Sequence, residues 1–472
     1  MYPLPLITVA SMFPENYNIN FVDLSIQELI EEEILDSDLV LITGMITEEN
    51  FVLEFIQKCK ALGKPVIVGG PYVTATDKVI DYATVVKGEA EEVIKRVIQD
   101  FENCSLQKSY TGCAANMTKS PCPRYDLLDM DSYYYGLIQW SRGCPYSCEF
   151  CDISLVYGKE QRQKSISQLL NEFDVLYELG FRGGLEFADS NLITNKGVIP
   201  LMEAIINWQK EHNYPFEFRG QASINLAKMS KLLGKMTEAG FKQLFVGIET
   251  PVKKNLKQLN KFHNANIDIG WAIHKLHKAG IRLDCGTILG IDNEPNDISD
   301  IIIELYDSLN VTIPAISLLT ATNNTKLYNR LIKEERLIAT NASRNAVALN
   351  FKPSRPRNTV IEDFKKIAEK FYNPKNYLSR CENYLVTYRG GHTVSIKLAL
   401  SYFAEYIRLY PDDEYTQFFI DYICRISERD ISLLGKAVDL GLIGFHLFKI
   451  KNWYIELLNQ EEQSIHKENI VK

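Results

Sequence analysis

Three cysteines, Cys144, Cys148 and Cys151, lie within the stretch SRGCPYSCEFCDI and have the spacing C-x3-C-x2-C. Three neighbouring thiolates can bind zinc or an iron–sulfur cluster, and the fourth ligand distinguishes the two. No histidine follows before His212 and no cysteine before Cys285, so the second ligand pair of a structural zinc site is missing. The pattern therefore favours an iron–sulfur cluster with one iron open to a non-protein ligand.

Strand-like and helix-like segments alternate after this loop and could position ligands at regular intervals. Amphipathic stretches such as 165–180 and 265–280 each end with a glycine, as helices often do. Six such βα units predict a parallel sheet with ligands beyond the carboxyl ends of its strands. The strand candidates are 136–143, 183–191, 216–225, 243–250, 282–292 and 315–322.

The cysteine motif resembles that of the radical S-adenosylmethionine (radical SAM) enzymes, which place an aromatic residue before the third cysteine, here Phe150. Together with GKEQRQKS, it is similar to the branch with an N-terminal cobalamin-binding-type domain. Nearly the whole chain resembles the subgroup with a C-terminal helical extension, which includes bacterial hopanoid methylases. The resemblance implies that the three cysteines bind a [4Fe–4S] cluster whose open iron chelates S-adenosylmethionine. Reductive cleavage then gives a 5′-deoxyadenosyl radical that abstracts a substrate hydrogen.

The resemblance also implies contacts to S-adenosylmethionine at the strand ends. Phe150 is expected to pack on the adenine, and Asp189 and Asn191 lie where the family places groups near the amino acid moiety. A purely structural role also stays open, because Asp and Asn residues cap helices and glycines form turns without binding a ligand. The other candidates are Gln221 and Ser223 on the third strand, Glu249 at the end of the fourth, and Gly286 and Gly290 on the fifth.

The first hundred residues show a second α/β pattern, with strands expected in YNINFVDLS, SDLVLITGM, KPVIVGGPYVT and ATVVKGEAEEVI. The phrases VIVGGPY and VVKGEAE resemble the flavodoxin-like cobalamin-binding-type domain of the branch. That resemblance makes Thr43, Gly44, Gly69 and Gly70 candidate cobalamin contacts. Glycines also follow buried strands in doubly wound folds that hold no ligand there.

Two departures from the family pattern leave two roles open for this domain. No D-x-H-x-x-G motif offers a histidine to cobalt, and MYPLPLITVA resembles the first helix of the domain, without the strand that relatives place before it. That strand is central in a flavodoxin-like order. Either the given start is internal or the domain is pared down, so it either holds cobalamin or is a vestigial scaffold.

The fold class expected is α/β with a mostly helical end. We predict a flavodoxin-like, cobalamin-binding-type domain over 1–112, a linker over 113–135, a radical SAM core over 136–335 and a helical domain over 336–472. The resemblance specifies the core as a partial (β/α)6 barrel. C-terminal helices are expected near 359–373, 393–409, 413–426 and 428–440, and the last stretch, 441–458, favours a core-packed helix over an interfacial one.

Composition limits the partners and the compartment. Hydrophobic residues make up 46% and charged residues 24%, as in globular proteins, and the net charge of −8 argues against nucleic acid as a partner. The apolar runs are short for a membrane span and the N-terminus lacks the basic region of a signal peptide. We therefore expect a cytoplasmic protein without a transmembrane segment. Its expected partners are a small-molecule or lipid-like substrate and an external electron donor such as flavodoxin or ferredoxin.

Three functions remain open from the sequence. The first is radical SAM chemistry with cobalamin that methylates an unactivated carbon. The second is a radical SAM rearrangement, epimerisation or other transfer beside a vestigial first domain. The third is a structural or electron-transfer metal site without radical chemistry, which the three-ligand count and the six βα units oppose. Methylthiolation of tRNA is disfavoured, because those enzymes carry further cysteines at metal spacing in the first domain, where Cys59 and Cys104 of this chain stand far apart, and because the C-terminal region here is helical.

Overall fold

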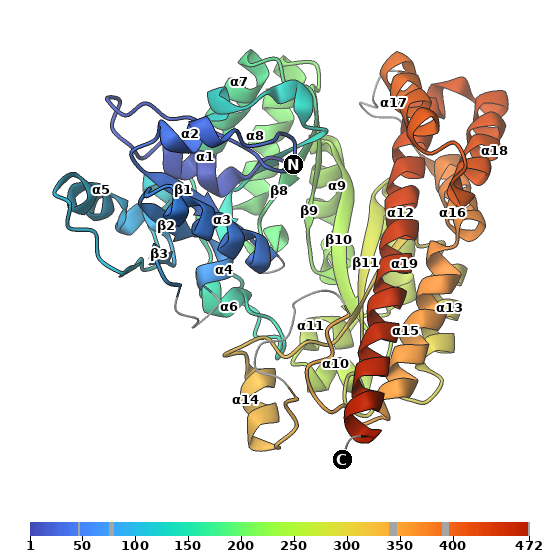
Figure 1. Ribbon diagram of the computed structural model, residues 1–472. Helices are drawn as coiled ribbons and strands as arrows, with labels where there is room; N and C mark the ends of the chain where they lie inside the picture. The colour runs from blue at the N-terminus through green and yellow to red at the C-terminus, as the bar shows by residue number, and fades with distance from the viewer. Residues whose placement is uncertain (46–47, 75–79, 339–346, 389–395, 471–472) are drawn as a thin grey trace. The chain divides into compact units, whose positions relative to one another are not determined.

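The computed structural model describes residues 1–470 except 46–47, 75–79, 339–346 and 389–395 (Figure 1). The chain forms two compact units. Among the described residues, unit 1 comprises 1–221 and 321–334, and unit 2 comprises 222–320, 335–338 and 347–470. Both units contain strands of the predicted core, so the domain boundaries expected from the sequence remain a prediction.

Unit 1 begins with a parallel sheet of four strands in the order β1-β2-β3-β4. Side chains alternate across a strand, so Val66 and Val68 pack on one layer of helices while Ile67 between them packs on the other. Helices α2, α3 and α4 belong to the first layer, and α1 and α5 to the second. The strands are β1 (Val40–Thr43), β2 (Val66–Gly69), β3 (Ala83–Lys87) and β4 (Ser109–Thr111), and the helices are α1 (Leu4–Ala10), α2 (Glu31–Leu35), α3 (Glu49–Ala61), α4 (Pro71–Thr74) and α5 (Ile94–Glu102).

One expected strand of this domain does not form. Residues 17–25 have no strand structure, whereas the other three expected strands are present and the predicted first helix is α1. A strand needs a hydrogen-bonded neighbour, and the second strand of a flavodoxin-like sheet pairs only with the first. In the described chain the preceding residues form α1 and turns, so this segment has no strand to pair with.

Unit 1 also contains the first half of the core. Three parallel strands follow the order β5-β8-β9, and α7 and α8 connect them. A capping box between Ser165 and Gln168 starts α7, and Gly180 with a φ of 84° ends it. The elements are β5 (Tyr135–Ile138), β6 (Ser141–Arg142), α6 (Ile153–Val156), β7 (Arg162–Gln163), α7 (Ile166–Glu178), β8 (Gly183–Phe187), α8 (Val198–Glu211) and β9 (Phe216–Gln221).

Unit 2 contains the other three strands of the predicted core, parallel in the order β10-β11-β12. All six strands overlap the ranges expected from the sequence, which confirms the α/β class and the parallel core. Asp268 caps α12, and its side chain accepts a hydrogen bond from the Trp271 N–H at 2.8 Å. The elements are α9 (Ser230–Ala239), β10 (Phe241–Glu249), α10 (Lys253–Gln258), α11 (Phe262–Ala265), α12 (Ile269–Lys278), β11 (Arg282–Leu289), α13 (Ile298–Ser308) and β12 (Ile313–Leu318).

The C-terminal region is helical, as predicted, but its helices differ in two places from the ranges expected from the sequence. Helix α16 was not predicted from the sequence. It begins at Pro374, where a missing N–H costs nothing, and is capped by Asn373. The expected helix at 428–440 is interrupted at Asp430, where the chain is extended with a φ of −161°. The expected start of α17 at 393–395 lies outside the described residues. The helices are α15 (Arg357–Tyr372), α16 (Pro374–Thr387), α17 (Ile396–Leu409), α18 (Glu414–Arg429) and α19 (Leu434–Ile470).

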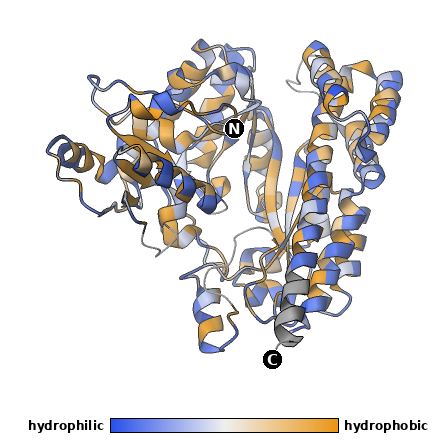
Figure 2. Cartoon of the chain, viewed as in Figure 1, coloured by the Kyte–Doolittle hydropathy of each residue, from blue (hydrophilic) through white to orange (hydrophobic). Residues whose placement is uncertain are grey.

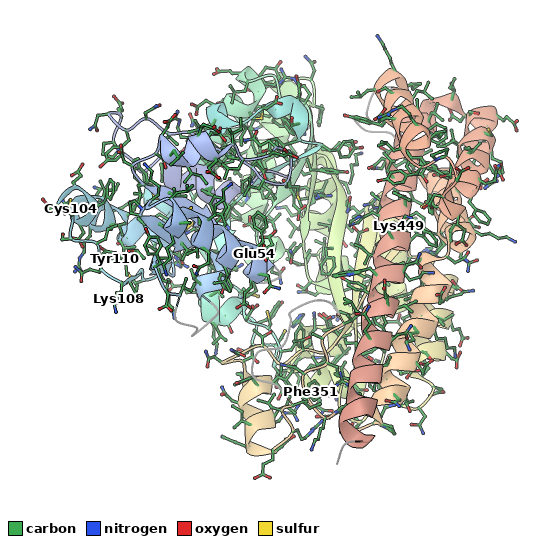
Figure 3. The ribbon with its side chains drawn as sticks, in the orientation of Figure 1. Glu54, Cys104, Lys108, Tyr110, Phe351 and Lys449 are labelled. Atoms are coloured by element: carbon green, nitrogen blue, oxygen red, sulfur yellow. The ribbon has the colours of Figure 1, made fainter. Side chains whose placement is uncertain are left out.

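Helix α19 packs as a core helix of unit 2. A Cβ on Gly441 would overlap the ring of Phe419, and one on Gly444 would overlap Tyr415 and Tyr377, so these glycines let the helices approach closely. Lys449 of α19, labelled in Figure 3, forms an ion pair with Asp413, which lies just before α18.

By length and composition alone, Ile431–Gln460 passes as a membrane span, contrary to the expectation from the apolar runs. It is the one such helix among the described residues, and 50% of its most apolar window is buried. Hydrophobic and hydrophilic residues both occur along α19 (Figure 2). Length and composition do not separate a core helix from a span, and its packing against Phe419 and Tyr415 is that of a core helix.

Candidate active site

A two-stranded ribbon, β6 with β7, holds the base of the cysteine loop. Gly143 has a φ of 96°, and a Cβ there would overlap the carbonyl oxygen of Glu160, so glycine is required where the loop leaves β6. The Cys144 N–H donates to the Gly158 carbonyl at 3.3 Å. The loop is therefore closed at its base by its own backbone.

The three cysteines are partly buried free thiols on this one loop. Burial raises the pKa of Cys151 to about 12, and the nearby Cys148 and Cys144 act in the same direction. No three Cys, His, Asp or Glu side chains in the described parts of the chain converge as a single metal ion would need. A [4Fe–4S] cluster binds each thiolate through a different iron, so its ligands need not converge on one point. The donor set fits a cluster of this kind.

Asp189 anchors the strand that enters the cysteine loop. Its carboxylate is fully buried and accepts hydrogen bonds from the Trp140 N–H at 3.0 Å and from the Ser141 N–H at 2.6 Å. The Ser141 hydroxyl also donates to it, and Asn195 donates to that hydroxyl at 2.8 Å. Burial raises the pKa of Asp189 to about 6. The predicted contact of Asp189 with the cofactor remains a prediction.

Two residues of α14 (Lys326–Lys333), Arg330 and Leu327, contact the cysteine loop at Glu149 within unit 1. Glu149, beside the half-buried Phe150, pairs with Arg330 at 2.7 Å, and the Leu327 N–H donates to the Glu149 carbonyl. This ion pair was not predicted from the sequence, because Glu149 and Arg330 are 181 residues apart. No local signal links them.

The other residues of unit 1 that were predicted to contact S-adenosylmethionine are Asn191 and Gln221, near the carboxyl ends of β8 and β9. Asn191 is buried after β8, and its carbonyl accepts a hydrogen bond from Gln161 of the cysteine loop at 3.2 Å. Gln221 ends β9 and is exposed. Asn191 is therefore brought to the cysteine loop, while a cofactor contact of either residue stays a prediction.

In unit 2, Glu249 ends β10 in an uncommon backbone conformation. Its φ is 65°, next to a register shift between Gly247 and Glu249. The buried carboxylate pairs with Lys261, and a Cβ on Gly247 would overlap this pair. Strained residues of this kind are found at functional sites. Lys261 is a partner that the sequence analysis did not find.

Of the remaining candidates, Ser223 comes after the end of β9 and Gly290 directly after the end of β11, whereas Gly286 lies within β11. A Cβ on Gly286 would come within 2.8 Å of the Phe245 ring. Gly290 has a φ of 92° and donates its N–H to Glu294 at 3.0 Å. The Ser223 hydroxyl donates to Asn225 at 2.5 Å. These contacts account for both glycines by turn and packing needs, and their approach to the adenine stays a prediction.

The four cobalamin candidates lie along the carboxyl edge of β1 and β2. Thr43 is directly opposite Gly69 in the sheet, and a Cβ on Gly70, whose φ is 92°, would overlap the Thr43 hydroxyl. A Cβ on Gly69 would meet nothing nearer than 3.7 Å. Thr43, Gly69, Gly70 and the adjacent Gly44 thus form an edge of small residues, which is compatible with a flat macrocycle.

The basic stretch 350–358 and the exposed Cys104 are not part of the candidate site. Arg355 of the basic stretch 350–358 is buried and pairs with Asp363 at 2.6 Å and with Glu294 at 3.4 Å. Cys104 lies exposed after α5 (Figure 3). The internal pairs of Arg355 argue against its binding an anionic substrate.

Comparisons with known proteins agree with this geometry. The profile of the Radical SAM superfamily matches residues 138–305, and that of a domain of unknown function, DUF4070, matches residues 325–460. The chain is 35% identical to uncharacterized methyltransferase sll1242 of Synechocystis sp., covering 80% of this chain and 72% of that protein. It is 30% identical to hopanoid C-2 methylase of Rhodopseudomonas palustris, covering 84% of this chain and 75% of that protein.

A solved structure shows the same fold. The apo form of OxsB, described as a cobalamin-dependent S-adenosylmethionine radical enzyme, matches with a TM-score of 0.62 at 16% identity, covering 99% of this chain and 78% of that one. Parallel βα strands with three cysteines on one loop define a radical SAM enzyme, which uses a [4Fe–4S] cluster and S-adenosylmethionine. Within that superfamily, the chain belongs to the family that includes hopanoid C-2 methylase.

Proposed function

We propose that this radical SAM enzyme is a cobalamin-dependent methyltransferase acting on an unactivated carbon of a small-molecule or lipid-like substrate. The observation that carries the proposal is the 30–35% identity, over 80% and 84% of the chain, to two proteins named as methyltransferase and methylase. One of these relatives acts on a hopanoid, which is the reason for including lipid-like substrates. The small-residue edge of β1 and β2 supports cobalamin.

The roles of the chain's residues follow from their positions. Cys144, Cys148 and Cys151 would hold the cluster, while Asp189 fixes the backbone that leads into their loop. When bound, the cluster and S-adenosylmethionine supply a 5′-deoxyadenosyl radical, and cobalamin supplies the methyl group. Phe150 would cover the adenine.

The remaining contacts and the surroundings of the enzyme belong to the same proposal. The other cofactor contacts are assigned to Asn191, Gln221, Ser223, Glu249, Gly286 and Gly290, and the cobalamin contacts to Thr43, Gly44, Gly69 and Gly70. A one-electron donor such as flavodoxin or ferredoxin would reduce the cluster. A cytoplasmic location would keep the free thiols reduced.

Anaerobic reconstitution with iron, sulfide and hydroxocobalamin tests the proposal. After desalting, we expect a visible spectrum and metal analysis that show one cluster and one cobalamin per chain. The matched variants are Gly70→Ala, whose new Cβ would overlap Thr43, and Gly234→Ala, where a Cβ meets nothing within 4 Å. Gly70→Ala should lose cobalamin and keep its iron, and Gly234→Ala should keep both.

The other outcomes distinguish the alternatives. A cluster without cobalamin in the unaltered chain would favour a radical rearrangement, epimerisation or other transfer, with the first domain as a scaffold. The absence of a strand at 17–25 is the structural observation that supports this alternative. Failure to form any cluster would contradict the assignment of the three cysteines.

A further inference from the structure

A loop of the first α/β domain reaches the base of the cysteine loop within unit 1. It follows β3 and contains Gly88 and Glu89 of the VVKGEAE stretch, to which the proposed function gives no role. Gly88 has a φ of 77°, and a Cβ there would overlap the Gly112 carbonyl oxygen. A Cβ on Gly112 would in turn overlap the Glu89 carbonyl. This close backbone contact fixes the direction in which Glu89 leaves the sheet.

The Glu89 carboxylate binds two arginines at once. Its Oε2 accepts hydrogen bonds from Arg142 Nη1 at 2.8 Å and from Arg162 Nη1 at 2.9 Å, and its Oε1 accepts one from Arg162 Nη2 at 2.5 Å. The Ala115 N–H donates to the same carboxylate at 3.2 Å. Glu91 lies 2.8 Å from Arg142 Nη1. Charge-assisted, bidentate pairs of this kind are among the stronger hydrogen bonds in proteins.

The two arginines occupy the two ends of the cysteine loop. They are direct partners in the antiparallel pairing of β6 with β7. Arg142 precedes Cys144 by two positions, with Gly143, which has a positive φ, between them. Arg162 also donates to the Tyr157 carbonyl inside the loop at 3.0 Å. A shift of the Glu89 carboxylate would therefore be transmitted to both ends of the loop.

The charges of this group balance, with two carboxylates, Glu89 and Glu91, against the two guanidinium groups of Arg142 and Arg162. Their side chains are 6–15% exposed. Burial acts to raise the pKa of Glu89, but hydrogen bonds from Arg162 and the charge of Arg142 hold it below its usual range. The Glu89 carboxylate is therefore charged at neutral pH. Its loss would leave excess positive charge beside the loop, and net charge tunes the reduction potential of an iron–sulfur cluster.

We propose that Glu89 is a positioning residue through which the first α/β domain sets the geometry and the electrostatic potential of the cluster-binding loop. It acts through Arg142 and Arg162 and does not touch the reacting atoms. The inference rests on the proposed function only in that the cysteine loop binds the cluster, and it does not depend on methyl transfer.

The test compares Glu89→Gln with Glu92→Gln in the reconstituted full chain. Glu92 is exposed at the end of the same short helical turn, Ala90–Glu92, so the control makes the same charge change. We expect Glu89→Gln to retain its iron, to have a more positive cluster midpoint potential, and to form 5′-deoxyadenosine about 10–100-fold more slowly per cluster. Its electron paramagnetic resonance spectrum with S-adenosylmethionine should also change. Glu92→Gln should match the unaltered chain in every measurement.

A second variant, Arg162→Lys, separates geometry from charge. Lysine keeps the charge but cannot donate two parallel hydrogen bonds. We expect slower 5′-deoxyadenosine formation per cluster at an unchanged midpoint potential, and this variant decides the question if Glu89→Gln does not fold. Unaltered rates per cluster in the folded variants, with a changed melting temperature alone, would overturn the proposal. An enzyme that cleaves S-adenosylmethionine without binding cobalamin would contradict the methyltransferase proposal and leave this one standing.

Discussion

At the scale of single residues, Asp189 controls how the chain enters the cysteine loop. Both of its oxygens accept hydrogen bonds, and the donors include two successive backbone N–H groups, those of Trp140 and Ser141. A bound cofactor would have to compete with these donors for the carboxylate. The first role of Asp189 is therefore to hold the backbone three residues before Cys144.

The three cysteines are tested singly. Replacement of Cys144, Cys148 or Cys151 by Ala should abolish 5′-deoxyadenosine formation, because a site with two thiolates cannot hold the cluster with its open iron in place. Replacement of the exposed Cys113 is the matched control and should leave the rate unchanged. Iron content and 5′-deoxyadenosine are measured on the same samples. A triad variant that still cleaves S-adenosylmethionine would show that the cluster assignment is wrong.

Spacing is a property of the sequence, which is why the three-cysteine loop could be predicted. The partners of buried charges are set by folding and could not be. Arg330 reaches Glu149 across 181 residues, and Arg162 reaches Glu89 across 73. The stretch around Glu89 resembles a cobalamin-binding-type domain in its sequence, but the two arginine partners of Glu89 are known only from the fold.

At the scale of elements, α12 contains a half-buried titratable group, His277. Burial lowers the pKa of His277 to about 4, and the charge of the neighbouring His274 acts in the same direction. The unfolded chain takes up this proton near pH 6.5 and the folded chain only near pH 4, so stability falls as the pH drops through this window. The contribution is about 3 kcal/mol at most.

Replacement of His277 by Gln should therefore reduce the loss of stability between pH 7 and pH 5. Denaturant unfolding at several pH values measures it, with His274→Gln, on the exposed side of the same helix, as the control. The slope of stability against pH should flatten in the first variant and stay nearly unchanged in the second. Equal slopes in all three proteins would show that the pKa of His277 is not lowered in the folded chain.

Elements were predicted where their signal is local, and missed where it is not. The strands of the core are apolar runs that end in small or polar residues, and all six were found. Residues 17–25 read as a strand but have none to pair with, because pairing depends on what the rest of the sheet provides. Helix α16 was missed because Pro374 reads as a break, although it stands at the first helical position.

At the scale of the whole molecule, the candidate cofactor residues are divided between the two compact units. The three cysteines, Phe150 and Asp189 belong to unit 1, whereas Glu249 belongs to unit 2. Binding of the cluster and binding of S-adenosylmethionine should therefore be separable by substitution. A change in unit 2 can weaken cofactor binding while the cluster ligands stay intact.

Replacement of Glu249 by Gln tests this division. The substitution removes the charge of the side chain and leaves the backbone at position 249 as it is. The loss of a hydrogen bond to a charged group costs ~1.5–3 kcal/mol. We expect the iron content to be unchanged and the KM for S-adenosylmethionine to rise about tenfold or more. Glu304→Gln, on the exposed side of α13 in the same unit, is the control and should leave both values unchanged. Loss of iron in Glu249→Gln would mean that the cluster depends on unit 2, and an unchanged KM would mean that Glu249 serves Lys261 alone and not the cofactor.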